Sequence, residues 1–361
     1  MAGAGRRAGE RLIAPADGCA AAPTSGRVRG ALLLLACGDA LGAPFVGMTR
    51  IAPGAVDTVL ACAQPLRWTG CTAASLVVAE HVTRRGTVNP EVLGRELAAR
   101  RSRPPVQRPA PGAGEAGWAW VPREPARPGA ALDVGGAAVS VAPLGLVAGW
   151  EPATVARHAR RAAAVMHDDP LVGDGAAVMA MAVAVAATAG QTGLAAPEVF
   201  VGRLAEHVRD GRVVRALRRV PALVGSQAAP GRVAAAFGDG LSAVAPVLVA
   251  VTGFLRHQRS PWLAVRFAIR VGGDTLAAAA ATGAQCGAHL GQWQVPPQWA
   301  TRLAGQPLLA TTAGALASLG RIAEGSQRPQ PAVQLSGEAR SAVRIGDRPP
   351  VGTGSGGRGD R

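Results

Sequence analysis

Apolar residues recur with a helical period over most of the chain between residues 27 and 324, and this pattern predicts a protein built from helices. The predicted helical stretches include 27–44, 72–85, 152–167 and 170–190. The same pattern predicts helices at 90–101, 196–209, 241–256, 260–271 and 275–290, with a short one near Pro296. Almost no stretch alternates apolar and polar residues between turn signals, as a half-buried strand would.

Particular residues mark where these helices begin and end. Pro44 stops the first helix, because proline lacks the amide that continues a helical hydrogen-bond ladder. Pro90 suits the first position of a helix, where that amide is not needed. Thr69 or Thr72 is expected to cap the helix that runs to Arg85.

Small residues cover most faces of the predicted helices. Ala, Gly and Ser let helix backbones approach closely, and no heptad repeat of large apolar residues is present. We therefore predict an all-α fold, a compact orthogonal multi-helix bundle.

Composition divides the chain into one domain with two tails. Residues 1–26 lack periodicity and predict a disordered N-terminal tail. Residues 27–324 form the predicted domain, in which 102–130 is a loop insertion that contains seven prolines. Residues 325–361 are rich in Gly, Arg, Ser and Pro and predict a disordered C-terminal tail.

The net charge of +15 changes this picture little. All 38 basic residues are Arg and none is Lys, which indicates a bias across the whole chain, so nucleic-acid binding is not expected. The five cysteines are widely spaced and predict neither a zinc knuckle nor a disulfide framework, which favours a cytoplasmic protein. The apolar run 241–255 is too short for a bilayer, so no membrane partner is expected.

Four segments carry the chemistry when they are taken together. They are "RVRGALLLLACGDALGAP" (27–44), "RWTGCTAASLVVAE" (67–80), "GGAAVSVAPLGL" (135–146) and "RVGGDTLAAAAATGAQCGAHLGQWQVPPQW" (270–299). In this order and spacing they resemble the ADP-ribosylglycohydrolase family, which includes the dinitrogenase-reductase-activating glycohydrolases. The resemblance covers residues 27 to 303.

The resemblance implies a cleft with two divalent metals that hold the ribose and orient water. Family ligands come from a Thr-Asp-Asp motif, which here reads Thr69, Gly70 and Cys71, and from a last motif in which Asp274 remains and Leu276 replaces the second Asp. Three of the four expected metal carboxylates are missing. One carboxylate does not neutralise two dications, and hard cations bind thiols poorly. Thr69 and Asp274 are thus the remnant of a metal site.

Some of the family's other site positions survive. Asp274 is a ligand position by resemblance, and an aspartate before a helix is also a common N-cap, which we favour. Asp39 is a candidate ligand-binding residue or a brace for the loop through backbone amides. His167 lies near the nucleotide in the family, and the alternative is a hydrogen-bonded histidine at a helix end.

Glycines complete the set of candidate ligand-binding residues. Gly135 and Gly136 present backbone amides to a phosphate or allow a tight turn, and both alternatives stay open. Gly272 and Gly273 keep a close backbone approach in the last motif. No residue qualifies as catalytic.

The sequence predicts a catalytically impaired family member, a pseudoenzyme that binds ADP-ribose-like ligands. The alternative is an active metal-assisted hydrolase that removes ADP-ribose from modified protein side chains. No cofactor is expected, and Mg²⁺ or Mn²⁺ would be the ions if the family site is partly retained. The expected partner is ADP-ribose or an ADP-ribosylated protein.

Overall fold

The structure is a computed structural model that describes residues 23–101, 134–189, 193–238 and 240–327. The chain divides into two compact units, Met1–Gly325 and Ser326–Arg361, and the first is described below. Within the described residues every regular element is a helix, and extended pairing is limited to an isolated bridge between Leu66 and Leu303. The predicted all-α fold is confirmed.

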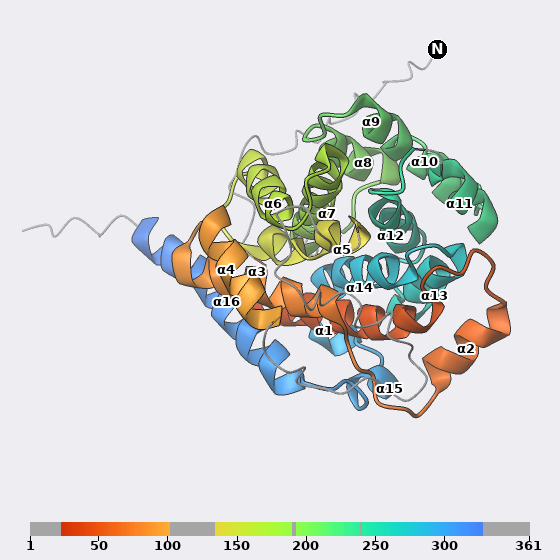
Figure 1. Ribbon diagram of the computed structural model, residues 1–361, viewed down its shortest axis with the longest axis horizontal. Coiled ribbons are helices and arrows are strands. Elements are labelled where there is room, and N and C mark those ends of the chain that lie inside the picture. Colours follow the sequence, from red (N-terminus) through yellow and green to blue (C-terminus); the bar gives the residue numbers. More distant parts are fainter. Residues whose placement is uncertain (1–22, 102–133, 190–192, 239, 328–361) are drawn as a thin grey trace, which may run out of the picture. The chain divides into compact units, whose positions relative to one another are not determined.

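The α-helices and the short 3₁₀ helices (η) are connected mostly by short turns (Figure 1). Their bounds are α1 (Ser25–Gly42), η1 (Ala43–Phe45), α2 (Pro53–Ala61), α3 (Gly70–Arg85), α4 (Pro90–Arg101), α5 (Val134–Val139), η3 (Ala142–Leu146), α6 (Pro152–Met166), α7 (Pro170–Thr188), α8 (Pro197–Ala205), α9 (Gly211–Leu217), α10 (Val220–Gly225), α11 (Pro230–Phe237), α12 (Ala245–Arg256), α13 (Pro261–Val271), α14 (Thr275–Leu290), η4 (Gln292–Gln294), α15 (Pro297–Ala300) and α16 (Gln306–Gln327).

Helices α1 and α14 form the centre of this unit and lie side by side in Figure 1. A Cβ atom on Gly38 of α1 would lie 2.1 Å from the carbonyl oxygen of Ala279, and one on Gly283 of α14 would lie 2.0 Å from that of Leu34. The residue number falls along α14 as it rises along α1, so the two helices are antiparallel. Their backbones approach so closely that only glycine fits at these contacts.

The other helices pack around this pair. Helix α7 contacts α5, α6 and α14, while α12 and α13 cover another side of α14 (Figure 1). Near the end of the domain, Trp299 is fully buried, stacks on Trp262 at 5.4 Å between ring centroids, and donates a hydrogen bond from Nε1 to the Leu60 oxygen at 3.3 Å. This contact fixes α15 against the end of α2.

Two helices of the described part, α1 and α7, are long and apolar enough to cross a membrane by length and composition alone. Within their most apolar windows, 83% and 78% of the residues are buried inside the protein. Burial in a helical core accounts for this apolar composition without a membrane.

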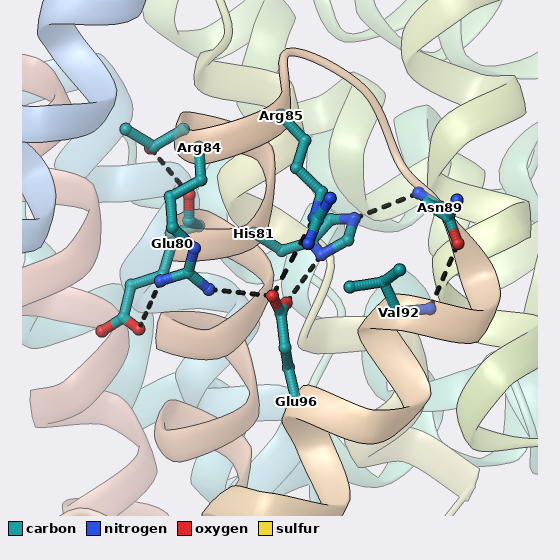
Figure 2. A network of polar contacts seen from close by, with 9 residues as sticks. Glu80, His81, Arg84, Arg85, Asn89, Val92 and Glu96 are labelled. Carbon is teal, nitrogen blue, oxygen red and sulfur yellow. Dashed lines mark hydrogen bonds and ion pairs between the residues drawn. The ribbon is translucent and has the colours of Figure 1, made fainter.

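Helices α3 and α4 are joined by a network of polar contacts (Figure 2). The buried His81 ring accepts a hydrogen bond on Nε2 from the Asn89 amide at 3.0 Å, so its Nδ1 carries the proton and donates to Glu96 Oε2 at 2.7 Å. Arg84 reaches the other oxygen of Glu96 at 3.1 Å. A buried histidine is thereby satisfied at both nitrogens.

The predicted boundaries differ from the structure in several places. Helix α1 begins at Ser25, inside the predicted N-terminal tail, and α16 continues through Gln327, beyond the predicted limit of 324. The helix predicted at 196–209 ends at Ala205. Residues 1–22, the loop insertion 102–130 and residues 328–361 lie outside the described residues.

Candidate functional site

The first part of the site is a carboxylate that bridges two helices. Asp39, near the end of α1, is fully buried and accepts four hydrogen bonds from the start of α3. The Thr69 hydroxyl donates to Oδ1 at 2.7 Å, and the Thr69 amide donates to Oδ2 at 2.9 Å. The Thr72 amide and hydroxyl donate to Oδ2 at 3.0 and 2.5 Å.

This arrangement makes Asp39 the cap of α3 in place of a local residue. Thr69 occupies the N-cap position of α3, and its side chain makes no capping hydrogen bond. The amide of Thr72 belongs to the first turn, whose amides have no partner within the helix. Asp39 satisfies it from α1, so the side chains of Asp39 and Thr69 are both engaged in holding the two helices together.

Burial sets the electrostatics of this carboxylate. Removal of Asp39 from water raises its pKa, and the hydrogen bonds from Thr72 and Thr69 lower the pKa only in part. All four donors are neutral groups, and no cationic side chain of the described residues forms an ion pair with Asp39. The site therefore offers this acid hydrogen bonds without a compensating charge.

The second part of the site lies at the start of α14. Asp274 is the N-cap of this helix, and its Oδ1 accepts a hydrogen bond from the Ala277 amide at 3.0 Å. A Cβ atom on Gly135 of α5 would lie 2.0 Å from Asp274 Oδ2. Two predicted site residues from distant segments thus lie in contact, and a side chain at position 135 would displace this carboxylate.

The turn before α14 is held against the segment after η1. Gly272 and Gly273 have φ angles of 86° and 76°, in the left-handed region that favours glycine. The Gly273 amide donates to the Met48 oxygen at 2.9 Å, and the Gly47 amide donates to the Gly273 oxygen at 2.9 Å. A Cβ on Gly272 would lie 2.6 Å from the Met48 oxygen, so the close backbone approach here is to the chain's own backbone.

Gly135 and Gly136 lie in the first turn of α5 and not in a loop. Neither has a positive φ angle, so the tight turn considered for them is not what the structure contains. The Gly136 oxygen accepts hydrogen bonds from the amide and the hydroxyl of Ser140, at 2.9 and 2.6 Å. Gly135 packs closely against Asp274, and Gly136 takes part in the regular hydrogen bonds of a short helix.

His167 occupies the connection between α6 and α7. It follows the last residue of α6, and its Nδ1 accepts a hydrogen bond from the Asp169 amide at 3.1 Å. Asp169 in turn caps α7 by accepting from the Leu171 amide at 2.9 Å. This is the local geometry of a hydrogen-bonded histidine at a helix end. His167 takes no part in the hydrogen bonds between Asp39 and Thr69 or in the contact between Gly135 and Asp274.

Comparison with known proteins identifies the family to which the chain belongs. The sequence model of the family described as ADP-ribosylglycohydrolase matches residues 21–331. The chain belongs to the ADP-ribosylglycohydrolase family. A solved structure titled "ADP-ribosylglycohydrolase-related protein complex" is similar over 82% of this chain and 98% of that chain, with 24% identity and a TM-score of 0.58, and this likeness shows the fold alone. No curated protein matches the chain.

Members of the ADP-ribosylglycohydrolase family act on ADP-ribosylated substrates, and the resemblance implies two divalent metals at the family's site. The donor set here does not fit such a pair. Both carboxylate oxygens of Asp39 and the hydroxyl of Thr69 are engaged with each other or with α3, Cys71 is buried, and Leu276 packs against the core. Among the described residues, no group of three or more His, Cys, Asp or Glu side chains is arranged to hold a metal ion.

Sequence reasoning missed one member of this ADP-ribosylglycohydrolase-like site. Thr72 was considered only as a cap of its own helix, whereas its hydroxyl and amide both bind Asp39. The available signal was the spacing Thr-x-x-Thr at the start of a helix, which places two hydroxyls beside the first-turn amides. Without a known partner for α3, that spacing does not reveal which carboxylate it meets.

Proposed function

We propose that this chain is a catalytically silent ADP-ribosylglycohydrolase, a pseudoenzyme whose cleft recognises an ADP-ribose-like ligand or an ADP-ribosylated protein without metal ions. The observation that carries the proposal is the use of Asp39. Asp39 uses both carboxylate oxygens to hold the start of α3, and Asp274 is the one carboxylate at the four positions where the resemblance implies metal carboxylates.

Charge supports the loss of the metal pair. Two dications about 4 Å apart repel each other by about 4 kcal/mol even in water, and by several times more in a cleft of lower dielectric. Active sites of this kind offset the repulsion with several carboxylates. A single carboxylate that also caps α14 does not provide this compensation, and water activation by a metal is lost with it.

Apolar side chains occupy the remaining positions. Val46, where the family resemblance implies a glutamate near the scissile bond, is 40% exposed, and Leu276 stands at the position of the second aspartate. These residues have no group that exchanges a proton with water or with a leaving group. The supported role is recognition without turnover.

The decisive experiment measures three quantities on the purified full chain. We expect no stoichiometric Mn²⁺ by metal analysis, no release of ADP-ribose from an ADP-ribosylated arginine substrate with added Mn²⁺, and heat of binding on titration with metal-free ADP-ribose. Turnover by the wild type overturns the loss of catalysis. Absence of heat at about millimolar ADP-ribose overturns the recognition role. A Kd of about 1 mM corresponds to a binding free energy of only about −4 kcal/mol, so even weak recognition would be detected.

A restored variant sharpens this test. Gly70→Asp, Cys71→Asp and Leu276→Asp together return the missing carboxylates, and we expect Mn²⁺ to bind to this variant. The matched control places three carboxylates at exposed helical glycines with open space around them, Gly54→Asp, Gly225→Asp and Gly314→Asp. Manganese bound equally by both variants would show an effect of net charge and contradict the assignment of the candidate site.

A further inference from the structure

A groove lies between α8, α9 and α10, away from the candidate site, with a volume of about 640 Å³. Its floor is apolar, and its rim carries charges of both signs. The lining residues are Glu198, Val201, Gly202, Ala205, Glu206, Val214, Arg218, Pro221 and Ala222. We call this feature the α8–α10 groove.

The charged groups on this face are available for a partner. Glu198 and Glu206 stand on the α8 side, and Arg218 faces them from the end of α9. All three side chains are exposed, as is Arg215 one turn earlier. Within the described part of the chain, none of these four groups takes part in an ion pair.

The shape of the groove suits the side chain of an arginine. An arginine has an apolar stem that packs on an apolar floor and a planar head that bonds carboxylates. Val201, Ala205 and Pro221 supply the floor, and Glu198 and Glu206 stand about two turns of helix apart at its rim. Gly202 keeps the groove open, since no atom lies within 4 Å of where its Cβ would be.

We propose that the α8–α10 groove is a self-association face, in which the groove of each copy receives the exposed arginines of a second copy. A two-fold interface pairs each patch with its own equivalent, so it needs both halves of every contact on one face. This face has them, with acids on α8 and arginines on α9. The exposed Val199 on α8, 50% accessible, adds apolar area beside the charges. The proposal is independent of the function of the cleft.

The first test measures the weight-average mass of the full chain by sedimentation equilibrium over a range of concentrations. We expect the mass to rise from one chain towards two, and the association to weaken when salt is raised from about 0.05 to 0.5 M, because exposed charge pairs are screened. Gly202→Trp fills the groove and should weaken association at least tenfold. Gly54→Trp, at an exposed glycine of α2 with equally open surroundings, should leave it unchanged.

A charge-swap experiment distinguishes this face from other routes to a dimer. Glu198→Arg with Glu206→Arg, and Arg215→Glu with Arg218→Glu, should each be monomeric alone, while an equimolar mixture of the two should recover the mass of a dimer. Thermal melts of each variant confirm that it is folded. A wild type that stays at the mass of one chain, a Gly202→Trp variant that associates normally, or a mixture that fails to recover overturns the proposal. If the α8–α10 groove instead receives a cationic peptide of another protein, the purified wild type stays at the mass of one chain.

Discussion

The two ends of α3 are each held by a carboxylate from another helix, but in opposite electrostatic settings. At the N-terminal end, Asp39 of α1 is fully buried and accepts hydrogen bonds only from the neutral Thr69 and Thr72. At the C-terminal end, Glu96 of α4 is partly exposed and meets His81 and Arg84 (Figure 2). Burial raises the pKa of Asp39 above its usual range. Burial also acts to raise the pKa of Glu96, but the hydrogen bonds and charges of His81 and Arg84 outweigh it and leave that pKa lowered.

This difference explains why Asp39, the buried acid of the candidate site, is poorly suited to metal chemistry. A metal ligand must be ionised and must turn its oxygens towards the ion. Asp39 is destabilised as an anion by its burial, and its oxygens are turned towards α3. The lowered pKa of Glu96 favours its ionised form, but Glu96 lies beside the C-terminal end of α3, whereas Asp39 lies beside the N-terminal end. Asp39 and Glu96 both hold helices together, and neither stands at a position where the family resemblance implies a metal carboxylate.

The largest expected effect comes from Asp39→Ala. It leaves two buried backbone amides and two hydroxyls of Thr69 and Thr72 without their acceptor, and each unsatisfied amide costs about 1 to 3 kcal/mol. We expect the free energy of unfolding to fall by about 3 to 5 kcal/mol. Urea denaturation measures this change, with the same dependence of unfolding free energy on urea concentration used for both proteins.

Two further variants calibrate this value. Asp39→Asn keeps one acceptor oxygen and should lose less than Asp39→Ala. Asp274→Ala removes an ordinary N-cap hydrogen bond and should cost about 1 kcal/mol. If Asp39→Ala proved no more harmful than Asp274→Ala, the bridging role of Asp39 between α1 and α3 would be wrong.

A smaller loss is expected from Glu96→Gln. The variant removes the negative charge that His81 and Arg84 contact while it keeps the shape of the side chain. Hydrogen bonds to charged groups contribute about 1.5 to 3 kcal/mol, and the partial exposure of Glu96 reduces this to about 1 kcal/mol. Urea denaturation beside the wild type measures the change, and an unchanged midpoint would contradict a stabilising contact between α3 and α4.

The fold was predictable from the sequence because helical periodicity and small residues are local signals. The small residues on most helix faces predicted close helix contact, and the structure places Gly38 of α1 against Ala279 of α14. The helix start at Pro90 was likewise predicted from the lack of an amide on proline. The short helices α9, α10 and α11, in contrast, were not predicted, since each has fewer than three turns over which a period can be counted.

The candidate site was predictable only in part, because its contacts join distant segments. The capping role of Asp274 follows from its place before a helix, and the structure shows that hydrogen bond. No local pattern indicates that Gly135 lies against Asp274, or that Asp39 reaches Thr72 across 33 residues. The partner of His81 was missed for the same reason, because Glu96 lies on another helix.

The pH dependence of stability should separate the two ends of α3. A folded-state pKa raised above the unfolded value means that wild-type stability, relative to Asp39→Asn, is highest at low pH and falls as pH rises through the folded pKa. For Glu96 the folded pKa is lowered, so wild-type stability relative to Glu96→Gln is present above the unfolded pKa and is lost as pH falls through the folded one.

Urea midpoints of the wild type and these two variants, measured between about pH 3 and 8, therefore should give difference curves of opposite slope. Slopes of the same sign would mean that the neutral donors to Asp39 and the donors to Glu96 affect the two pKa values in the same direction. The comparison of the two ends of α3 would then fail.

The smallest effect is expected for Arg84→Gln. The Arg84 side chain is 54% exposed, and it contacts both Glu80, four residues earlier on α3, and Glu96 on α4. Exposed ion pairs of this kind contribute about 0 to 1 kcal/mol and are screened by salt. We expect a loss of less than about 0.5 kcal/mol that disappears at about 1 M salt, whereas the loss from Asp39→Ala should persist there because its hydrogen bonds are buried. A loss from Arg84→Gln as large as that from Glu96→Gln would show that Arg84 provides most of the stabilisation of Glu96, and His81 little of it.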